Sequence, residues 1–412
     1  MENKRKIIND PVFGFINIPT ERIYRLIQHP YFQRLSRIKQ LGVASFVYPG
    51  GQHTRFQHSL GAMHLTNEAI HVLRTKGHEI TPYEAENLLI AILLHDIGHG
   101  PFSHVLEYSL VKNIHHETIS QWMMKDINNK LGGELDLALD IFNDRYPKRF
   151  LHQLISSQLD MDRLDYLRRD SFFTGVTEGN IGSARIIKML NVKDDRLVVE
   201  AKGIYSIENF LTARRLMYWQ VYLHKTAVAA EKMLVNTLLR AKELAQRGEY
   251  LFASPALTFF LYRLITEKDF ADNSEALSLF ALLDDSDIWC ALKAWTKHSD
   301  RILALLSRYL INRQVFKIEI SNHPFDGKRM EQFTRNVAAR LAIPETEAHY
   351  FVCADTISTN MYNREDDRID ILFNDGTLKD ISEASDMLNI SLLSKEVRKY
   401  YFCYVRINDE SL

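Results

Sequence analysis

Two short stretches of the chain carry residue types that could do chemistry: Arg55-Phe56-Gln57-His58 and His95-Asp96-Ile97-Gly98-His99-Gly100. Together with a later aspartate they supply four candidate metal ligands: His58, His95, Asp96 and Asp162. A mixed set of imidazoles and carboxylates can hold one divalent cation and leave coordination positions open for water and substrate. A His-Asp pair alone is common, but the full set in this order is more specific and predicts a metal-dependent hydrolase.

The histidines are distributed unevenly, since ten of the 16 lie between His53 and His116. Imidazole is neutral enough near pH 7 to ligate a metal and basic enough to carry a proton, so a local excess favours a site of chemistry. A single histidine is more often an ordinary surface or core residue. That interpretation is kept for the isolated ones: His64, His71, His78 and His115.

Further imidazoles and a carboxylate follow the second stretch. His99 comes four residues after His95, so helical geometry would place it beside the metal, and His104 follows shortly afterwards. His116-Glu117 joins an imidazole to a carboxylate, which can orient the imidazole and keep it protonated as an acid. The same pair also suits the first turn of a helix, where an acidic residue is favoured by the helix dipole.

Three arginines and one tyrosine are candidates for contacts to substrate. The guanidinium group suits bidentate contact with phosphate oxygens, which makes Arg55, Arg163 and Arg214 candidate phosphate ligands. Tyr166 could border a sugar or a base. Taken singly, each arginine is more often a surface charge and the tyrosine more often a core residue.

The composition excludes several classes of protein. The chain has 412 residues, of which 46% are hydrophobic, and a net charge of −1. Such a chain can bury a large core, but it has no overall field to attract nucleic acid or an anionic membrane. Three widely spaced cysteines form neither a zinc pattern nor a disulfide framework, and no apolar segment follows the basic N-terminus. We therefore expect a cytoplasmic protein with no membrane span and no extensive nucleic-acid binding.

The spacing of apolar residues predicts a helical body over residues 20–240. Thr81-Pro82-Tyr83-Glu84 predicts a capped helix start, and the helix should run to His95-Asp96 before Gly98, Gly100 and Pro101 end it. A helical region over Arg22–Leu41 should break at Pro30 and end at Gly42. A small hairpin containing Arg196–Glu200 should precede one long helix from about Ser206 to Ala245.

The pattern changes near residue 315. Strands are predicted at Val315–Ile320 and Tyr350–Cys353, a helix at Asp326–Ala342, and a hairpin around Asn374-Asp375-Gly376. We therefore expect a mainly α protein with three parts: a helical catalytic core at 1–245, a helical extension at 246–314 and a small α+β subdomain at 315–412.

The ordered motifs resemble the HD-domain superfamily of metal-dependent phosphohydrolases and, more narrowly, its deoxynucleoside triphosphate (dNTP) triphosphohydrolases. The resemblance covers about residues 6–320. Besides the two stretches named first, it includes Ile8-Asn9-Asp10-Pro11, Phe32-Gln33-Arg34-Leu35, Ile38-Lys39-Gln40-Leu41-Gly42, His58-Ser59-Leu60-Gly61, Pro101-Phe102-Ser103-His104, His116-Glu117, Asp162-Arg163-Leu164-Asp165-Tyr166, Asp170, Arg214, Tyr222 and Arg313. The region begins almost at Met1, so we expect no sterile-alpha-motif domain.

The resemblance implies a reaction and the residues that perform it. Family chemistry is water attack at the α-phosphorus, which yields a deoxynucleoside and inorganic triphosphate. One divalent ion (Mn, Fe, Mg, Zn, Co or Ni) would be held by His58, His95, Asp96 and Asp162. The catalytic group would be His99, His116 and Glu117, with His104 near the leaving 5′ oxygen.

The resemblance also implies a substrate site. The triphosphate would be contacted by Arg55, Arg163, Tyr166 and Arg214. The deoxyribose would be bordered by Gln40 and Leu41, with Asp170 on its 3′-hydroxyl and Tyr222 crowding the 2′ position. That crowding would exclude ribonucleotides sterically.

Some family members are activated by nucleotides bound between subunits. The matching positions here are Lys6, Ile7, Gln33, Arg37, Arg313 and Lys317. Gln28 stands where the family has a guanine-reading acid, and an amide lacks the charged double acceptor that pairs with guanine. Tyr218 replaces a family histidine. We expect a homo-oligomer, either a dimer or a tetramer.

Two other functions stay open. The chain could be an HD phosphohydrolase or phosphodiesterase acting on another nucleotide or phosphate ester, or a nucleotide-binding regulator with a degenerate site. Gln40, Asp170 and Tyr222 favour the dNTP hydrolase, because other substrates do not need a deoxyribose pocket. The intact ligand set argues against the regulator.

Overall fold

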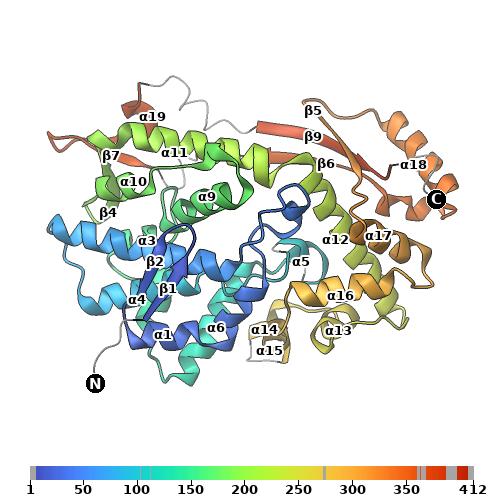
Figure 1. Cartoon of the computed structure of the whole chain (residues 1–412), viewed down its shortest axis with the longest axis horizontal. Coiled ribbons are helices and arrows are strands. Elements are labelled where there is room, and N and C mark those ends of the chain that lie inside the picture. The colour runs from blue at the N-terminus through green and yellow to red at the C-terminus, as the bar shows by residue number, and fades with distance from the viewer. Residues whose placement is uncertain are drawn as a thin grey trace.

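The computed structural model is mainly α, as predicted, and describes residues 6–102, 104–111, 113–271, 275–359, 362, 368–386 and 397–406. Helices fill the centre and lower part of the view in Figure 1. Strands within the described residues form small sheets on the flanks, ordered β1-β2, β3-β4-β7-β8 and β5-β9-β6. Among the residues that the structure describes, no helix is both long and apolar enough to cross a membrane.

The centre of the fold is formed by helices α3 (Arg55–Thr75), α4 (Pro82–Leu94) and α9 (Met161–Thr174). Helix α4 begins as predicted: Thr81 Oγ1 accepts from the Glu84 backbone N–H at 3.2 Å, and the Glu84 carboxylate accepts from the Thr81 N–H at 2.7 Å. Residues 88–94 are all buried, so the helix is a core element rather than a surface one. It ends at Leu94, with His95 as its C-cap.

Shorter helices surround this centre. Before residue 246 they are α1 (Glu21–Ile27), α2 (Pro30–Gln33), α5 (His104–Ser109), α6 (His116–Lys130), α7 (Asp136–Phe142), α8 (Arg149–Gln153) and α10 (Ser183–Met189). The helical extension contains α13 (Pro255–Tyr262), α14 (Glu267–Ala271), α15 (Glu275–Phe280), α16 (Asp285–Trp295) and α17 (Arg301–Ile311).

The region predicted as helix over Arg22–Leu41 breaks at Pro30, as expected, but it ends earlier than predicted. A 3₁₀ turn closes it at Arg37, and Lys39 then forms a β-bridge with Thr54. Gly42 has a φ of +48°, yet it begins a second 3₁₀ turn instead of capping a helix. The residues between the two turns contact the start of α3, where the Arg55 N–H donates to the Ile38 carbonyl oxygen at 3.0 Å.

The long helix predicted over about Ser206–Ala245 is two helices. Helix α11 (Ile204–Met217) is separated from α12 (Lys225–Gln246) by a π-helical turn over Tyr218–Tyr222. Such wide turns occur often at functional sites, and periodicity alone does not reveal them. The hairpin before α11 is present as predicted, with β3 (Leu190–Lys193) antiparallel to β4 (Arg196–Glu200).

Beyond residue 315 the structure has the predicted strands and helix, except that the strand predicted at Tyr350–Cys353 begins only at Val352, after a 3₁₀ turn that ends at Tyr350. They are β5 (Lys317–Ser321), α18 (Gly327–Leu341), β6 (Val352–Thr359), β7 (Asp370–Leu372), β8 (Leu378–Asp380), α19 (Ile381–Ala384) and β9 (Val397–Tyr404). Strands β7 and β8 form the hairpin expected from Asn374-Asp375-Gly376, and β7 pairs in parallel with β4. The C-terminal part thus shares a sheet with the preceding helical body, and the boundaries at 245 and 314 stay predictions.

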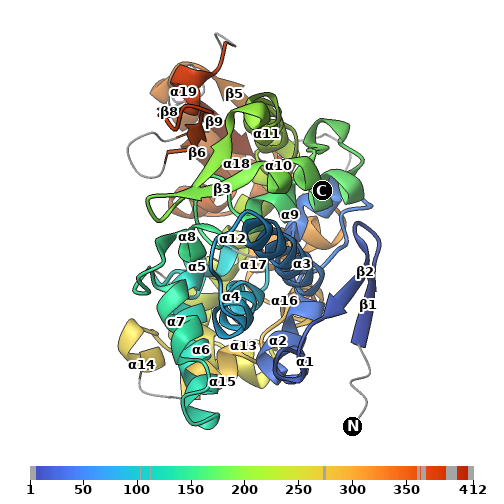
Figure 2. The same ribbon diagram turned by 90° about the vertical axis from the view of Figure 1, so that its left-hand side faces the viewer.

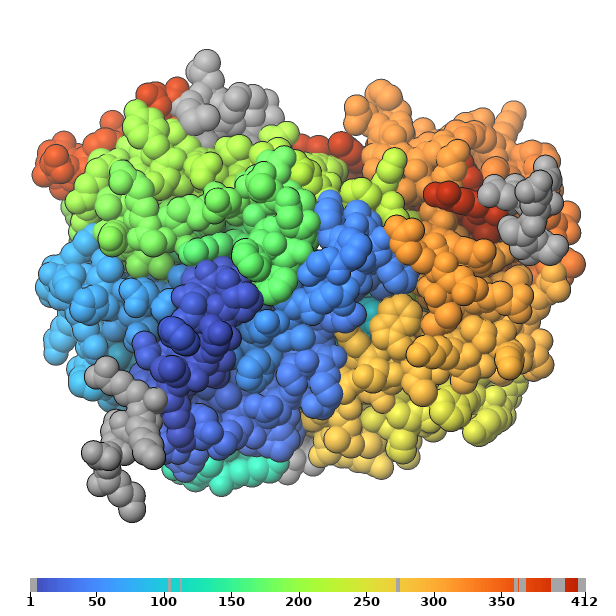
Figure 3. Space-filling model, viewed as in Figure 1, coloured from blue at the N-terminus to red at the C-terminus, as the bar shows by residue number. Residues whose placement is uncertain are grey.

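An N-terminal hairpin was not predicted. Strands β1 (Lys6–Asp10) and β2 (Gly14–Ile18) pair antiparallel, and the hairpin lies on one flank of the helical body in Figure 2. On the face seen in Figure 3, the blue N-terminal segment lies between the green segment and the orange surface of the helical extension. The Lys39 N–H donates to Asp285 Oδ2 at 3.0 Å, which joins these regions directly.

Candidate metal centre and active site

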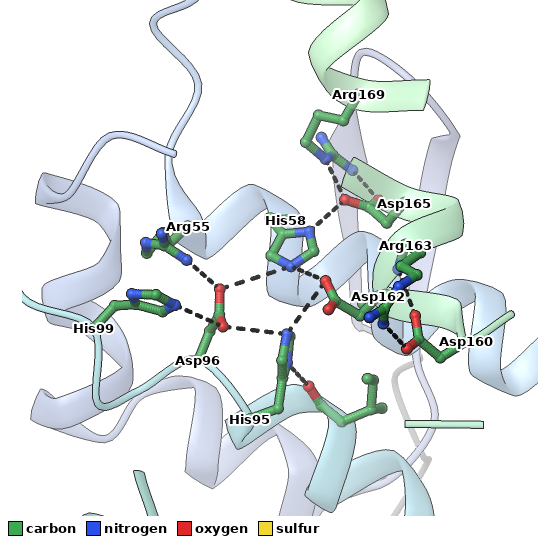
Figure 4. Close-up of polar contacts among 12 residues, drawn as sticks. Arg55, His58, His95, Asp96, His99, Asp160, Asp162, Arg163, Asp165 and Arg169 are labelled. Atoms are coloured by element: carbon green, nitrogen blue, oxygen red, sulfur yellow. Dashed lines mark hydrogen bonds and ion pairs between the residues drawn. The ribbon is translucent and has the colours of Figure 1, made fainter. Parts of the chain in front are cut away.

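Three helix ends bring the predicted metal ligands together. The first turn of α3 carries Arg55 and His58, which lie three residues apart and share a helix face. The end of α4 carries His95 and Asp96, and the first turn of α9 carries Asp162. Figure 4 shows these side chains converging from three directions.

The distances are those of a compact ligand cluster. His58 Nε2 lies 3.1 Å from Asp162 Oδ1 and 3.7 Å from Asp96 Oδ2. His95 Nε2 lies 3.3 Å from Asp96 Oδ1 and 3.7 Å from Asp162 Oδ1. Ligand atoms of His58, His95 and Asp162 all lie within 4.8 Å of one another. The predicted four-residue set is therefore one cluster in the structure.

Hydrogen bonds on the outer side of each imidazole orient the inner nitrogen. His58 Nδ1 lies 2.7 Å from Asp165 Oδ2, and His95 Nδ1 lies 2.6 Å from the Ile92 carbonyl oxygen. Both Nε2 atoms consequently face the cluster, an arrangement common for metal-bound histidines. His95 Nε2 is buried and has no hydrogen-bond partner among the described residues, which fits a metal ligand.

The charges of the cluster also fit a cation. Burial opposes ionisation of Asp162, but the adjacent imidazoles of His58 and His95 hold its pKa well below the usual range. Burial likewise lowers the pKa of His58, while Asp162 and Asp165 raise it to about 10. The carboxylates of Asp162 and Asp165 thus favour positive charge at His58. A divalent metal bound between the imidazoles and Asp162 would supply that charge in place of the imidazole protons.

A buried ion-pair network supports His58 from behind. Arg169 Nε lies 2.9 Å from Asp165 Oδ2, and Arg169 Nη1 lies 2.7 Å from Asp10 Oδ2. Gly61 makes room for it, because a Cβ atom there would lie 1.9 Å from Asp165 Oδ1. The sequence motifs contained Asp10, Gly61 and Asp165 but not Arg169, and the network was not predicted.

The predicted catalytic histidines form a second cluster beside the first. His99 Nε2 lies 3.3 Å from Asp96 Oδ1, and its ring stacks on the ring of His116 at 3.7 Å. His116 Nδ1 lies 2.8 Å from Glu107 Oε1. Burial and the nearby Arg55 cation hold the pKa of His99 well below its usual range. His104 begins α5, but its side chain lies outside the described residues.

The expected His116–Glu117 pair is corrected by the structure. Glu117 is exposed in the first turn of α6, and the carboxylate that contacts His116 is Glu107 of α5. Successive residues on a helix point about 100° apart, so the neighbour in sequence is not the neighbour in space. Gly98 permits the close approach of this helix, because a Cβ there would lie 2.2 Å from the His116 carbonyl oxygen.

The predicted phosphate-binding arginines are each held by a polar group. Arg55 Nη1 lies 2.5 Å from Asp96 Oδ2, Arg163 pairs with Asp160, and Arg214 Nη1 donates to Gln158 Oε1 at 2.9 Å. Arg55 and Arg163 flank the metal cluster in Figure 4.

Of the predicted sugar residues, Asp170 lies further along α9 and Tyr222 in the π-helical turn. Tyr222 donates to Asp170 Oδ2 at 2.6 Å, and its ring lies 5.9 Å from that of Tyr166. Tyr166 in turn lies 6.5 Å from the His58 ring, so the tyrosines join the metal cluster to Asp170. Leu41 is partly buried against the core.

One contact of this region was missed in the sequence. His53 Nε2 lies 2.7 Å from Asp170 Oδ1, and the Gln40 N–H donates to the His53 carbonyl oxygen at 3.0 Å. Only the local excess of histidines could have indicated His53.

The predicted effector residues are not brought together within one chain. Lys6 pairs with Glu21 at 3.4 Å, and Gln33 Nε2 donates to the Ile27 carbonyl oxygen at 2.7 Å. Arg37 pairs with Asp284 at 2.6 Å, Arg313 Nε donates to the Phe46 carbonyl oxygen at 2.9 Å, and the Lys317 ammonium lies 5.8 Å from the centroid of the Tyr404 ring. Ile7 is exposed on β1. Their effector role stays a prediction.

Comparisons with known proteins agree with this geometry. The HD domain model matches residues 55–170, and an HD associated region matches residues 181–249. A solved phosphohydrolase from Bacteroides thetaiotaomicron superposes with a TM-score of 0.95 at 63% identity, covering 98% of this chain and 100% of that one.

Two curated relatives extend the comparison. The uncharacterized protein YwfO of Bacillus subtilis is 31% identical over 97% of this chain and 92% of its own. The human deoxynucleoside triphosphate triphosphohydrolase SAMHD1 is 28% identical over 58% of this chain, which spans only 45% of that protein. The chain therefore belongs to the HD-domain superfamily of metal-dependent phosphohydrolases.

Proposed function

We propose that the protein hydrolyses dNTPs to a deoxynucleoside and inorganic triphosphate. The observation that carries the proposal is one face of α9, where Asp162, Tyr166 and Asp170 follow one another at four-residue spacing. This face carries, in order, a candidate metal ligand, an aromatic ring and a carboxylate hydrogen-bonded to Tyr222. A nucleotide lying along it would meet phosphate chemistry at one end and sugar recognition at the other.

The residues that would hold the metal are His58, His95, Asp96 and Asp162. A divalent cation bound there supplies Lewis-acid chemistry, polarising a phosphoryl oxygen and making water more acidic. Asp165 and the Ile92 carbonyl keep both imidazoles in the orientation this requires.

We assign proton transfer to the stacked pair His99 and His116, with Glu107 orienting His116. In the reaction, the oxygen of water bonds to the α-phosphorus and the bond from phosphorus to the 5′ oxygen breaks. One proton leaves the attacking water and one reaches the 5′ oxygen. Positioned imidazoles perform such transfers efficiently. By resemblance, His104 would lie near the 5′ oxygen.

The arginines would bind the triphosphate. Arg55, Arg163 and Arg214 are held by Asp96, Asp160 and Gln158 before substrate arrives, so their side chains are already ordered. Preordered donors lose less entropy when they bind an anion. The sugar would lie against Gln40, Leu41, Asp170 and Tyr222.

The test is a product assay on the full chain. Metal-stripped protein is reloaded with Mn²⁺ or Mg²⁺ and incubated with each dNTP, the four mixed, the matching ribonucleotides and a cyclic dinucleotide. The proposal expects equal amounts of triphosphate and deoxynucleoside, with slower turnover of ribonucleotides. Turnover only in the mixture would show that a nucleotide effector is needed.

Other products contradict the proposal. Release of phosphate or pyrophosphate, or turnover of the cyclic dinucleotide alone, would indicate a different phosphohydrolase. Nucleotide binding with no turnover under any metal would indicate a regulator.

We also infer a homo-oligomer, dimer or tetramer, because the effector candidates lie apart on one chain. Sedimentation showing a fully active monomer would contradict this inference.

A further inference from the structure

His53 is a buried histidine that neither binds the proposed metal nor belongs to the catalytic pair. It is 2% exposed and precedes the helix α3 that carries Arg55 and His58. Its Nε2 lies 2.7 Å from Asp170 Oδ1. The other oxygen of the same carboxylate accepts from the Tyr222 hydroxyl at 2.6 Å. Each oxygen of Asp170 therefore has one donor from the protein and keeps a second lone pair for another donor.

The position of the His53 ring is determined by its surroundings. The ring stacks on Phe173 with centroids 4.5 Å apart and an interplanar angle of 19°. The loop before it packs closely on α9, because a Cβ on Gly50 would lie 2.5 Å from the Phe173 carbonyl oxygen. Tyr48 of this loop donates to the Gln220 carbonyl oxygen at 2.5 Å, within the π-helical turn that carries Tyr222. The loop thus contacts both elements that supply the sugar site.

His53 also connects the two sides of that site. Its carbonyl oxygen accepts from the Gln40 N–H at 3.0 Å, while its ring contacts Asp170. Two buried atoms here, His53 Nδ1 and Gln40 Oε1, have no hydrogen-bond partner among the described residues. Buried polar atoms without partners are unfavourable and rare, and they mark positions where a further hydroxyl or water completes the hydrogen bonding.

We propose that His53 is a positioning residue that sets specificity for the 3′-hydroxyl of the substrate sugar, by fixing the carboxylate of Asp170. The proposal rests on the proposed function and deepens it. Without the Nε2–H donor, Tyr222 alone would hold one oxygen of Asp170, and the carboxylate could rotate away from the sugar. Binding of a sugar that carries a 3′-hydroxyl would weaken, while the metal centre and the catalytic histidines would keep their geometry.

The experiment compares two variants on two substrates with the full, metal-loaded chain. His53→Phe keeps an aromatic ring against Phe173 but removes the donor. His53→Gln keeps a side-chain N–H near the same place. The substrates are one dNTP and its 2′,3′-dideoxy counterpart, which lacks only the 3′-hydroxyl. The measured quantities are kcat and KM for each pair, together with thermal melting of each variant.

We expect His53→Phe to raise KM for the dNTP by about 10-fold, as loss of one charge-assisted hydrogen bond would, with kcat within about twofold. KM for the dideoxy substrate should stay within about twofold, so the preference for the 3′-hydroxyl collapses. His53→Gln should restore most of the preference. The ratio of kcat/KM for the two substrates in one preparation does not depend on the folded fraction, so partial unfolding does not obscure the result.

Equal losses on both substrates, or an unchanged preference in His53→Phe, would overturn the proposal and show a purely structural histidine. If the unmodified chain releases triphosphate from neither substrate, the proposed function itself fails, and the role of His53 fails with it. The two failures are distinct, because the first requires an active unmodified chain.

Discussion

The metal centre and the candidate effector residues differ in how their charges are satisfied. At the metal centre, the side chains of His58 and Asp165 are 1% and 0% exposed and contact each other. Among the effector candidates, the side chains of Arg37 and Lys6 are 50% and 37% exposed, and each pairs with a nearby acid. In Figure 1, β1 and β5, which carry Lys6 and Lys317, lie in separate parts of the fold.

This difference in burial indicates which of the two sites can form within a single chain. Buried charges are tolerated only when hydrogen-bonded partners surround them, so the metal centre must be assembled as the chain folds. Exposed pairs gain little and exchange partners easily, which leaves those residues available to a second surface. We therefore expect hydrolysis to depend on residues within one chain and effector response to depend on subunit contacts.

The largest expected effect is loss of a metal ligand. Asp162→Ala removes a candidate metal ligand whose Oδ1 lies 3.1 Å from His58 Nε2, and should lower turnover by at least ~10³-fold, since Lewis-acid stabilisation is worth several kcal/mol. Metal content after dialysis, measured by mass spectrometry, should fall in parallel. Full activity in a metal-free Asp162→Ala protein would contradict the proposal that hydrolysis depends on this metal centre.

A smaller loss is expected at the proposed catalytic histidines. Glu107→Gln keeps the size of the side chain but removes the charge that orients His116, and should lower kcat by about 10²-fold with metal content unchanged. Glu117→Gln is the matched control, because that carboxylate is exposed. A larger loss of kcat from Glu117→Gln than from Glu107→Gln would favour Glu117, as the sequence predicted, as the carboxylate that orients His116.

The support behind His58 should affect metal affinity. Asp165→Asn should weaken metal binding by about 10–100-fold, the range seen when partners of metal-bound histidines are removed. Excess metal should then restore most of the activity, as measured by titration of turnover. Weak activity that saturating metal does not change would show that Asp165 acts in some other way.

The smallest effect is expected at the effector surface. Arg37→Ala removes a half-exposed ion pair with Asp284 and should change the free energy of unfolding by less than about 1 kcal/mol.

The buried network behind the metal centre is the comparison. Arg169→Leu leaves Asp10 and Asp165 buried without their cation and should lower the free energy of unfolding by about 3–5 kcal/mol. Urea denaturation measures both. Similar losses in the two variants would contradict the distinction between the regions.

Residue types and local signals were enough to predict part of this structure. Imidazoles beside carboxylates indicated the ligand set, and Thr81-Pro82-Tyr83-Glu84 indicated the start of the helix that carries two of them. Asn374-Asp375-Gly376 likewise indicated the β7–β8 hairpin. In each case the signal lies within a few residues of the feature.

What the sequence could not show depends on contacts between distant segments. Glu107 reaches His116 from another helix, and Asp10 reaches Arg169 from the N-terminal hairpin. The π-helical turn at Tyr218–Tyr222 keeps helical periodicity on both sides, so apolar spacing does not reveal it. His53 has no acidic neighbour in sequence, and only folding brings it to Asp170.

The central claim, water attack at the α-phosphorus in this metal centre, is tested most directly by isotope transfer. The metal-loaded protein hydrolyses one dNTP in water enriched in ¹⁸O, and the products are weighed by mass spectrometry. The account predicts one ¹⁸O atom in the triphosphate and none in the deoxynucleoside. Label in the deoxynucleoside, or products other than triphosphate and deoxynucleoside, would contradict it.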